Sequence, residues 1–215
     1  MQYINHDELV NMAPRYRAQL INSLSGFKSA NLIGTRNRQG INNLAIFSSV
    51  FHLGASPALV GFIARPSSVE RHTIENIEQT KQFTINQVNV TIWQAAHQTS
   101  ARYNANECEF IQTGLSPDDI DGIDAPFVKE SRLKYALTLR EIVPIELNGT
   151  QLVIGEITDI FCDKEAIKKD GYIDIESLDT VMVSGLDSYH TSKRLSRLSY
   201  AKPGKSQSKI SLDGE

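Results

Sequence analysis

The sequence of 215 residues contains only two cysteines, Cys108 and Cys162, and no Cys-x-x-Cys motif. Two cysteines so far apart indicate reduced, partly buried thiols rather than a disulfide framework. The sequence also lacks a run of about 18 unbroken apolar residues, which a membrane-spanning helix needs. Its first residues have neither the basic nor the apolar segment of a secretory signal. We therefore expect a cytoplasmic protein that is not bound to a membrane.

Several motifs of common catalytic and binding sites are also missing. No Gly-x-Gly-x-x-Gly sequence is present, which argues against a Rossmann nucleotide site, and no Gly-x-Ser-x-Gly elbow of a hydrolase occurs. The five histidines are scattered without the paired spacing of metal ligands, so no metal site is predicted. The net charge of −3 argues against a surface that binds nucleic acid.

The apolar residues that are present, 40% of the chain, are enough to bury a full core in one domain. They fall into many short runs separated by turn residues. The clearest turn is Asn148-Gly149, and an Asn-Gly pair between two apolar runs is a strong hairpin signal. We therefore expect residues 133–146 and 151–161 to pair as antiparallel strands. Many short strands and few helices predict a mainly β fold, a β-barrel with a few peripheral helices.

The same patterns predict the other elements and the domain organisation. Further strands are predicted at residues 30–35, 41–50, 58–64, 81–88, 173–175 and 180–183, and helices at residues 15–24, 73–80 and 92–103. Residues 104–124 are predicted to be rich in loops. We expect residues 1–200 to form a single domain with an N-terminal helical extension at residues 1–25, and residues 201–215 to form a flexible tail.

The segment from residue 42 to 86 is the most informative about function. It contains two apolar, strand-like runs, the small polar residues Ser48 and Ser49, and then a short helical run that Arg71 and Thr73 open. The first turn of a helix offers unpaired N–H groups and a positive dipole end, and arginine binds phosphate through two donors. This layout suits a flat, amphipathic ligand that carries a phosphate. The alternative is a core strand with exposed serines, followed by an ordinary helix start with solvated arginines.

This segment resembles the flavin reductase-like family, the FMN-binding split β-barrels of the flavoredoxin type. The likeness has three parts: a strand that ends in Asn-x-Ala…Ser-Ser, a following strand that ends in an arginine, and a helix start of the form basic-x-Thr-x-x-Asn-Ile. The residues that carry it are Asn43, Ala45, Ser48, Ser49, Arg65, Arg71, Thr73, Asn76 and Ile77. With weaker matches further along the chain, the likeness covers roughly residues 24–200.

The resemblance implies a flavin reductase in which NAD(P)H passes a hydride to N5 of bound FMN. Such an enzyme places its cofactor and sets the electrostatics, so no catalytic residue is predicted. The family also implies a homodimer with FMN near the interface, and a small-molecule electron acceptor or a flavin-dependent partner enzyme. Two alternatives stay open: a non-enzymatic FMN carrier, and a split barrel that binds another cofactor, such as haem or an F420-type deazaflavin.

The resemblance also implies a set of cofactor-binding residues, with the ring beside the first strand and the phosphate near the helix start. The set is Asn43, Leu44, Ala45, Phe47, Ser48, Ser49, Arg65, Arg71, His72, Thr73, Asn76, His97, Thr99, Ser100 and Tyr189. For His97 the alternative is a packed or capping side chain, which is the commoner fate of a helix histidine. For Tyr189 the alternative is an ordinary core tyrosine.

Overall fold

The computed structural model describes residues 1–66, 72–104 and 107–215, and its centre is a curled antiparallel sheet. The strands of this sheet are β2 (Asn31–Arg36), β3 (Asn42–Phe47), β4 (Phe51–Ala55), β5 (Ala58–Ala64), β6 (Gln82–Gln87), β9 (Leu133–Ile145) and β10 (Thr150–Cys162). They lie in the order β3-β2-β6-β9-β10-β5-β4, and every neighbouring pair is antiparallel. The mainly β, split-barrel fold predicted from the sequence is confirmed.

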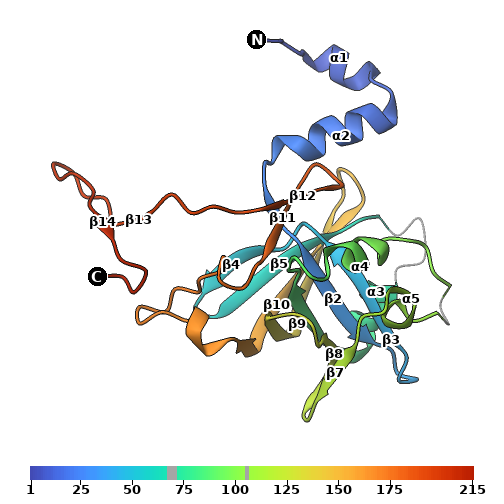
Figure 1. Ribbon diagram of the computed structural model, residues 1–215. Helices are drawn as coiled ribbons and strands as arrows, with labels where there is room; N and C mark the ends of the chain where they lie inside the picture. The colour runs from blue at the N-terminus through green and yellow to red at the C-terminus, as the bar shows by residue number, and fades with distance from the viewer. Residues whose placement is uncertain (67–71, 105–106) are drawn as a thin grey trace.

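Smaller elements surround the barrel. The helices are α1 (His6–Asn11), α2 (Pro14–Leu24), α3 (His72–Thr80), α4 (Trp93–Gln98), α5 (Glu109–Thr113) and the 3-10 helix η1 (Lys164–Ala166). The remaining strands are β1 (Lys28–Ser29), β7 (Pro117–Ile120), β8 (Ile123–Val128), β11 (Val181–Ser184), β12 (Ser188–Thr191), β13 (Arg197–Leu198) and β14 (Lys209–Ile210). Figure 1 shows α3, α4 and α5 gathered on one side of the barrel, and both ends of the chain extending away from it.

Strand β2 separates two hydrophobic cores because successive side chains of a strand point to opposite faces. Ile33 points into the barrel, where it belongs to a cluster with Phe62 and Phe83. Leu32 points to the other face, where it belongs to a second cluster with Leu44 on β3 and Phe110 on α5. Each buried side chain of this size contributes about 1.5–3 kcal/mol. The sheet is therefore fixed from both sides at β2, the strand that pairs with β3.

Helix α3 closes one end of the barrel. Its apolar residues Ile74 and Ile77 are buried in the barrel cluster with Ile33. Its polar residues Thr73 and Asn76 are buried as well, at the end of the helix where the chain enters from β5. A buried polar side chain needs hydrogen-bond partners, so this end of the barrel is where polar chemistry gathers.

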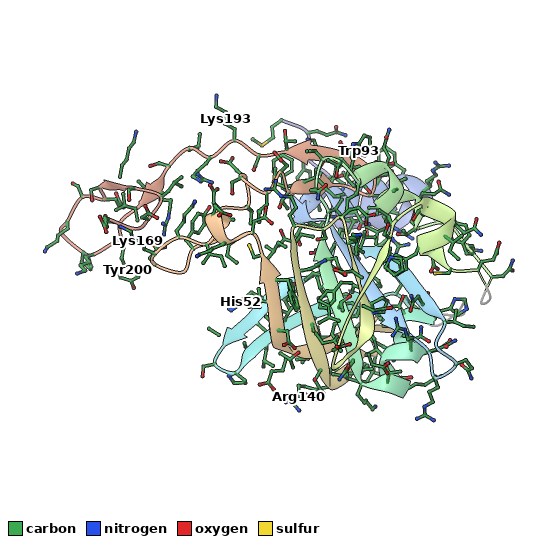
Figure 2. All side chains as sticks on the ribbon, turned by 60° about the horizontal axis from the view of Figure 1, so that its bottom comes forward. His52, Trp93, Arg140, Lys169, Lys193 and Tyr200 are labelled. Carbon is green, nitrogen blue, oxygen red and sulfur yellow. The ribbon has the colours of Figure 1, made fainter. Side chains whose placement is uncertain are left out.

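The C-terminal arm, residues 192–215, lies against a turn that follows η1. The Arg197 guanidinium bonds to Asp170 at 2.5 Å and lies 4.4 Å from the ring centre of Tyr172. Figure 2 shows Lys169 and Tyr200 on the same side of the molecule, away from Arg140 on the sheet. Within residues 201–215, strand β14 pairs with β13. That this segment is a flexible tail stays a prediction.

Several elements match their predictions closely. The hairpin at Asn148-Gly149 is confirmed, since β9 and β10 pair along their whole length. Helices are found at α2 and α3, where the sequence predicted residues 15–24 and 73–80. Strand β5 has the predicted bounds.

Three predictions were wrong. The predicted helix at residues 92–103 ends at Gln98 because the hydroxyls of Thr99 and Ser100 bond back to the carbonyls of Ala96 and His97, which competes with further helix. The loop-rich segment 104–124 contains α5 and the first strand of the β7–β8 hairpin, with Gly122 at φ +86° in its turn.

The strand predicted at residues 173–175 is absent from the part of the chain described. Ile173 makes a single bridge to Ile167, and the chain then turns where Ser177 donates twice to the Asp174 carbonyl.

Strand β4 was not predicted from the sequence. It is an edge strand whose residues are mostly exposed, so no alternation of apolar and polar residues marks it.

Across the helices described, none combines the length and the apolar character that a bilayer crossing requires.

Candidate functional site

A cavity of about 680 Å³ lies between the barrel and its peripheral elements. One wall comes from β3, the residues that follow it and the end of β5. The facing wall comes from α4, the residues that follow α4, and the β11–β12 hairpin. The predicted residues that line the cavity are Asn43, Ala45, Phe47, Ser48, Ser49, Arg65, His72, Thr73, His97, Thr99, Ser100 and Tyr189. The structure thus brings together residues up to 146 positions apart, between Asn43 and Tyr189.

Three residues of the predicted set stand apart from this group. Arg71 lies outside the described residues. In the structure as described, Leu44 is a core residue and Asn76 borders a smaller cavity instead. Both can act on the site through their neighbours.

Strand β3 supplies the flat wall of the cavity. Its alternation directs Asn43, Ala45 and Phe47 to one face, and the small Ala45 leaves the backbone accessible to a planar group. Within the described sheet, β3 is an edge strand that pairs only with β2. Its outer backbone edge can therefore exchange hydrogen bonds with a ligand.

The loop after β3 is fixed to β5 by the Ser49 hydroxyl. This hydroxyl donates to the Ile63 carbonyl at 3.0 Å and accepts from the Ile63 N–H at 3.2 Å. Ser49 therefore holds the loop in place, and the neighbouring Ser48 is left at the cavity wall.

The start of α3 forms the polar end of the cavity. The Asn43 amide donates to the Thr73 hydroxyl oxygen at 3.0 Å and to the Thr35 hydroxyl oxygen at 3.3 Å. The Asn76 amide donates to the same Thr35 oxygen at 3.1 Å. These four side chains are all buried, so β2, β3 and α3 are joined here by a polar network. Arg65, exposed at the end of β5, adds a cation to this end of the cavity.

Glu109 is a site residue that sequence reasoning missed. It is buried at the start of α5, lines the cavity, and accepts the Leu44 N–H of β3 at 2.9 Å. Burial raises the pKa of this carboxyl, and the Leu44 N–H and the charge of His72 oppose the shift. Glu109 lies in one of the weaker family matches, but a glutamate in the first turn of a short helix is usually solvated, so it was not predicted as a site residue.

The facing wall carries an aromatic cluster. His97 Nδ1 lies 3.0 Å from the Tyr189 hydroxyl, and the ring centres of Trp93 and Tyr189 are 5.3 Å apart. Burial, with a smaller effect of Asp187, raises the pKa of Tyr189, so this side chain keeps its proton at neutral pH. The pair is packed together and also borders the cavity, and its role in binding stays a prediction.

The N-terminal extension also reaches the cavity. Asn22 of α2 lines it beside Leu186 of the β11–β12 turn. The Lys28 ammonium joins these segments, since it donates to the carbonyls of Asn22 at 3.0 Å and Gly185 at 2.8 Å. Arg102, after α4, is a second arginine at the cavity that the sequence did not indicate.

A second cavity, of about 170 Å³, adjoins the first and shares Asn43 and His72 with it. Amide and carboxyl side chains dominate its lining.

Within the described residues, 1–66, 72–104 and 107–215, no three or more histidine, cysteine, aspartate or glutamate side chains form a cluster suited to a metal ion.

Comparison with known proteins agrees with this architecture. The family model for the flavin reductase like domain matches residues 25–177. The crystal structure of a candidate flavin reductase with a split barrel domain, from Shewanella frigidimarina NCIMB 400, is 54% identical in sequence. It covers 94% of this chain and 100% of its own, with a TM-score of 0.90.

More distant structures share the fold. Nitrilotriacetate monooxygenase component B from Bacillus cereus is 20% identical, with 92% of this chain and 98% of its own covered and a TM-score of 0.81. The flavoredoxin of Desulfovibrio vulgaris (Miyazaki F) is 24% identical, with 83% and 92% covered and a TM-score of 0.67. An uncharacterized protein of Aquifex aeolicus (strain VF5) is 25% identical over 115 residues, which are 53% of this chain and 59% of that protein.

Proposed function

Because the chain belongs to the family of flavin reductase-like domains, we propose that it is an FMN-binding oxidoreductase that uses NAD(P)H as its electron donor. The observation that carries this proposal is the cavity itself. It has a flat strand wall at β3 and a polar end that Thr73 and Arg65 line. Its volume of about 680 Å³ falls within the roughly 300–1,000 Å³ of sites for cofactor-sized ligands.

The residues present fit the two ends of FMN. Ala45 and Ser48 offer a flat surface for the isoalloxazine ring, with the β3 backbone edge beside it. Thr73, Arg65 and the N–H groups at the start of α3 suit the phosphate, because charge-assisted hydrogen bonds to phosphate are stronger than neutral ones. Arg71 is expected to join them from the resemblance alone.

Bound FMN would supply the chemistry, by accepting a hydride at its N5 atom and later passing the electrons on. The chain's own residues would bind FMN, orient it and shield it from solvent. The facing wall, with Tyr189 and His97, would help to orient a second planar molecule beside bound FMN. The neutral Tyr189 hydroxyl can donate its one hydrogen to a ligand there when His97 Nδ1 carries the hydrogen of their shared contact.

We also propose a homodimer with the cofactor near the interface. In the chain as described, neither α1 nor α2 contains a buried residue, although Tyr16 and Leu24 are apolar. Isolated helices shorter than about 12–15 residues are marginal in water, so α2 needs a surface to cover it. A second copy of the chain provides one, and α2 borders the cavity at Asn22.

The proposed function is tested by titrating the purified protein with FMN and then adding NADH or NADPH under anaerobic conditions. Saturable binding followed by bleaching of the bound flavin would support the oxidoreductase. Binding without bleaching by either nucleotide would favour a flavin carrier. A chain that stays colourless with excess FMN, or that takes up haem or a deazaflavin instead, would overturn the proposal.

A further inference from the structure

We propose that Thr35, a buried threonine of β2, is a positioning residue that directs the Thr73 hydroxyl toward the anionic group of the cofactor. This inference rests on the proposed function, because it needs a ligand with an anionic end in the large cavity. Thr35 itself is fully buried and does not touch that cavity in the structure described. Its effect must therefore pass through its neighbours.

The contacts of Thr35 link three elements. Its Oγ1 accepts one N–H from Asn43 on β3, at 3.3 Å, and one from Asn76 on α3, at 3.1 Å. The second N–H of the Asn43 amide goes to Thr73 Oγ1 at 3.0 Å. A side-chain amide nitrogen has two hydrogens to donate and accepts none, so the Asn43 amide is oriented by both threonines at once.

This orientation decides the role of the Thr73 hydroxyl. A threonine hydroxyl has one hydrogen to donate and two positions that accept. Asn43 fills an accepting position of Thr73, which leaves the Thr73 hydrogen available. Among the residues that the structure describes, none accepts that hydrogen, although the Thr73 side chain lines the cavity and the residue is only 7% exposed. A nearly buried donor of this kind requires an acceptor, and a phosphate oxygen in the cavity provides one.

Loss of the Thr35 hydroxyl would reverse this arrangement. In Thr35→Val the Asn43 and Asn76 amides would each lose an acceptor within a buried region, which is costly. Asn43 would then turn its carbonyl oxygen toward Thr73, because this satisfies both side chains. The Thr73 hydrogen would be donated to Asn43, and the anion would lose its partner.

The test compares FMN with riboflavin, which has the same ring system but no phosphate. We expect Thr35→Val to raise the Kd for FMN about tenfold or more and to change the Kd for riboflavin by about twofold or less. Thr35→Ser keeps the hydroxyl and should bind both flavins like the wild type. Thr35→Ala gives the same comparison if valine prevents folding.

Two further variants show whether the effect passes through Thr73. In a Thr73→Val background, Thr35→Val should cause no additional loss of FMN affinity, since the donor that it positions is already gone. Thr84→Val is the matched control. Thr84 is also buried, on β6, and its hydroxyl donates to the Pro126 carbonyl at 2.6 Å, away from the cavity. It should lower stability and leave the ratio of the two Kd values unchanged.

The possible outcomes separate this inference from the proposed function. If the wild type binds neither flavin, both are overturned. If the wild type binds FMN, but Thr35→Val weakens FMN and riboflavin equally or leaves FMN unaffected, the role of Thr35 alone is overturned. The same holds if Thr35→Ser behaves like Thr35→Val, or if the losses of Thr35→Val and Thr73→Val simply add.

Discussion

At the scale of single residues, Glu109 is a buried carboxyl of the site whose pKa is shifted by its surroundings. Burial raises its pKa, so the folded chain holds this proton at pH values where the unfolded chain releases it. The free energy of unfolding therefore falls as the pH rises from the ordinary glutamic acid pKa toward the raised folded value.

Glu109→Gln should remove this dependence. Glutamine keeps a carbonyl oxygen for the Leu44 N–H but does not titrate. We expect the variant to gain stability relative to the wild type as the pH rises through this window. Urea unfolding at a series of pH values measures the difference, and two curves that stay parallel would show that Glu109 is not the group responsible.

Ser48 tests the position of the flavin ring. It lies at the cavity wall where β3 ends, so Ser48→Leu should fill the space of the ring and reduce the affinity for FMN and riboflavin alike, by about a hundredfold. Absorbance titration gives both constants, and Ser48→Ala is the control that removes the hydroxyl without adding volume. A leucine variant that still purifies with bound flavin would place the ring elsewhere.

At the scale of elements, β2 depends on a close contact at Gly34. A side chain at this position would overlap the Pro126 carbonyl oxygen and the Thr84 hydroxyl. Gly34→Ala should therefore destabilise the fold by about 1–3 kcal/mol, measured by urea unfolding. Gly54→Ala, on the edge strand β4, meets only one atom at 3.4 Å and should be nearly neutral. Equal effects of the two changes would contradict this account of β2.

The elements that the sequence predicted are those whose signals are local. Asn148-Gly149 marks the β9–β10 hairpin by itself, and β5 is one continuous apolar run. Strand β4 is held by its pairing with β5, and β7 and β8 pair with each other in a two-stranded sheet. The residues of these strands carry weak signals of their own.

The candidate site also has a part with a local signal in the sequence and a part without one. The β3 wall and the α3 start lie within 31 residues of each other, from Asn43 to Thr73, so one segment revealed both. The facing wall is assembled from distant parts of the chain. Asn22 and Arg102 reach it only through folding, and no pattern around them marks them as site residues.

At the scale of the whole molecule, the N-terminal extension tests the proposed dimer. Leu24 is 73% exposed, and an exposed leucine of a monomer can be replaced with little effect. If a partner chain covers it, Leu24→Glu should raise the dimer dissociation constant at least tenfold, because burial of a leucine contributes about 1.5–3 kcal/mol.

Sedimentation equilibrium of the full chain measures this constant. Ile111→Glu is the control: Ile111 is 79% exposed on α5, which lies on another side of the body from α1 and α2 (Figure 1). A wild-type chain that sediments as a monomer, or a Leu24→Glu variant that dimerises like the wild type, would count against an interface at α2.

The bond between Glu109 and the Leu44 N–H has a consequence for how molecules meet one another. A bare sheet border recruits strands from other chains and so promotes aggregation. By occupying this N–H, the carboxyl denies an incoming strand one of the donors that it would need to pair with β3. The same contact that borders the cavity thus also helps to keep separate copies of the protein from joining sheet to sheet.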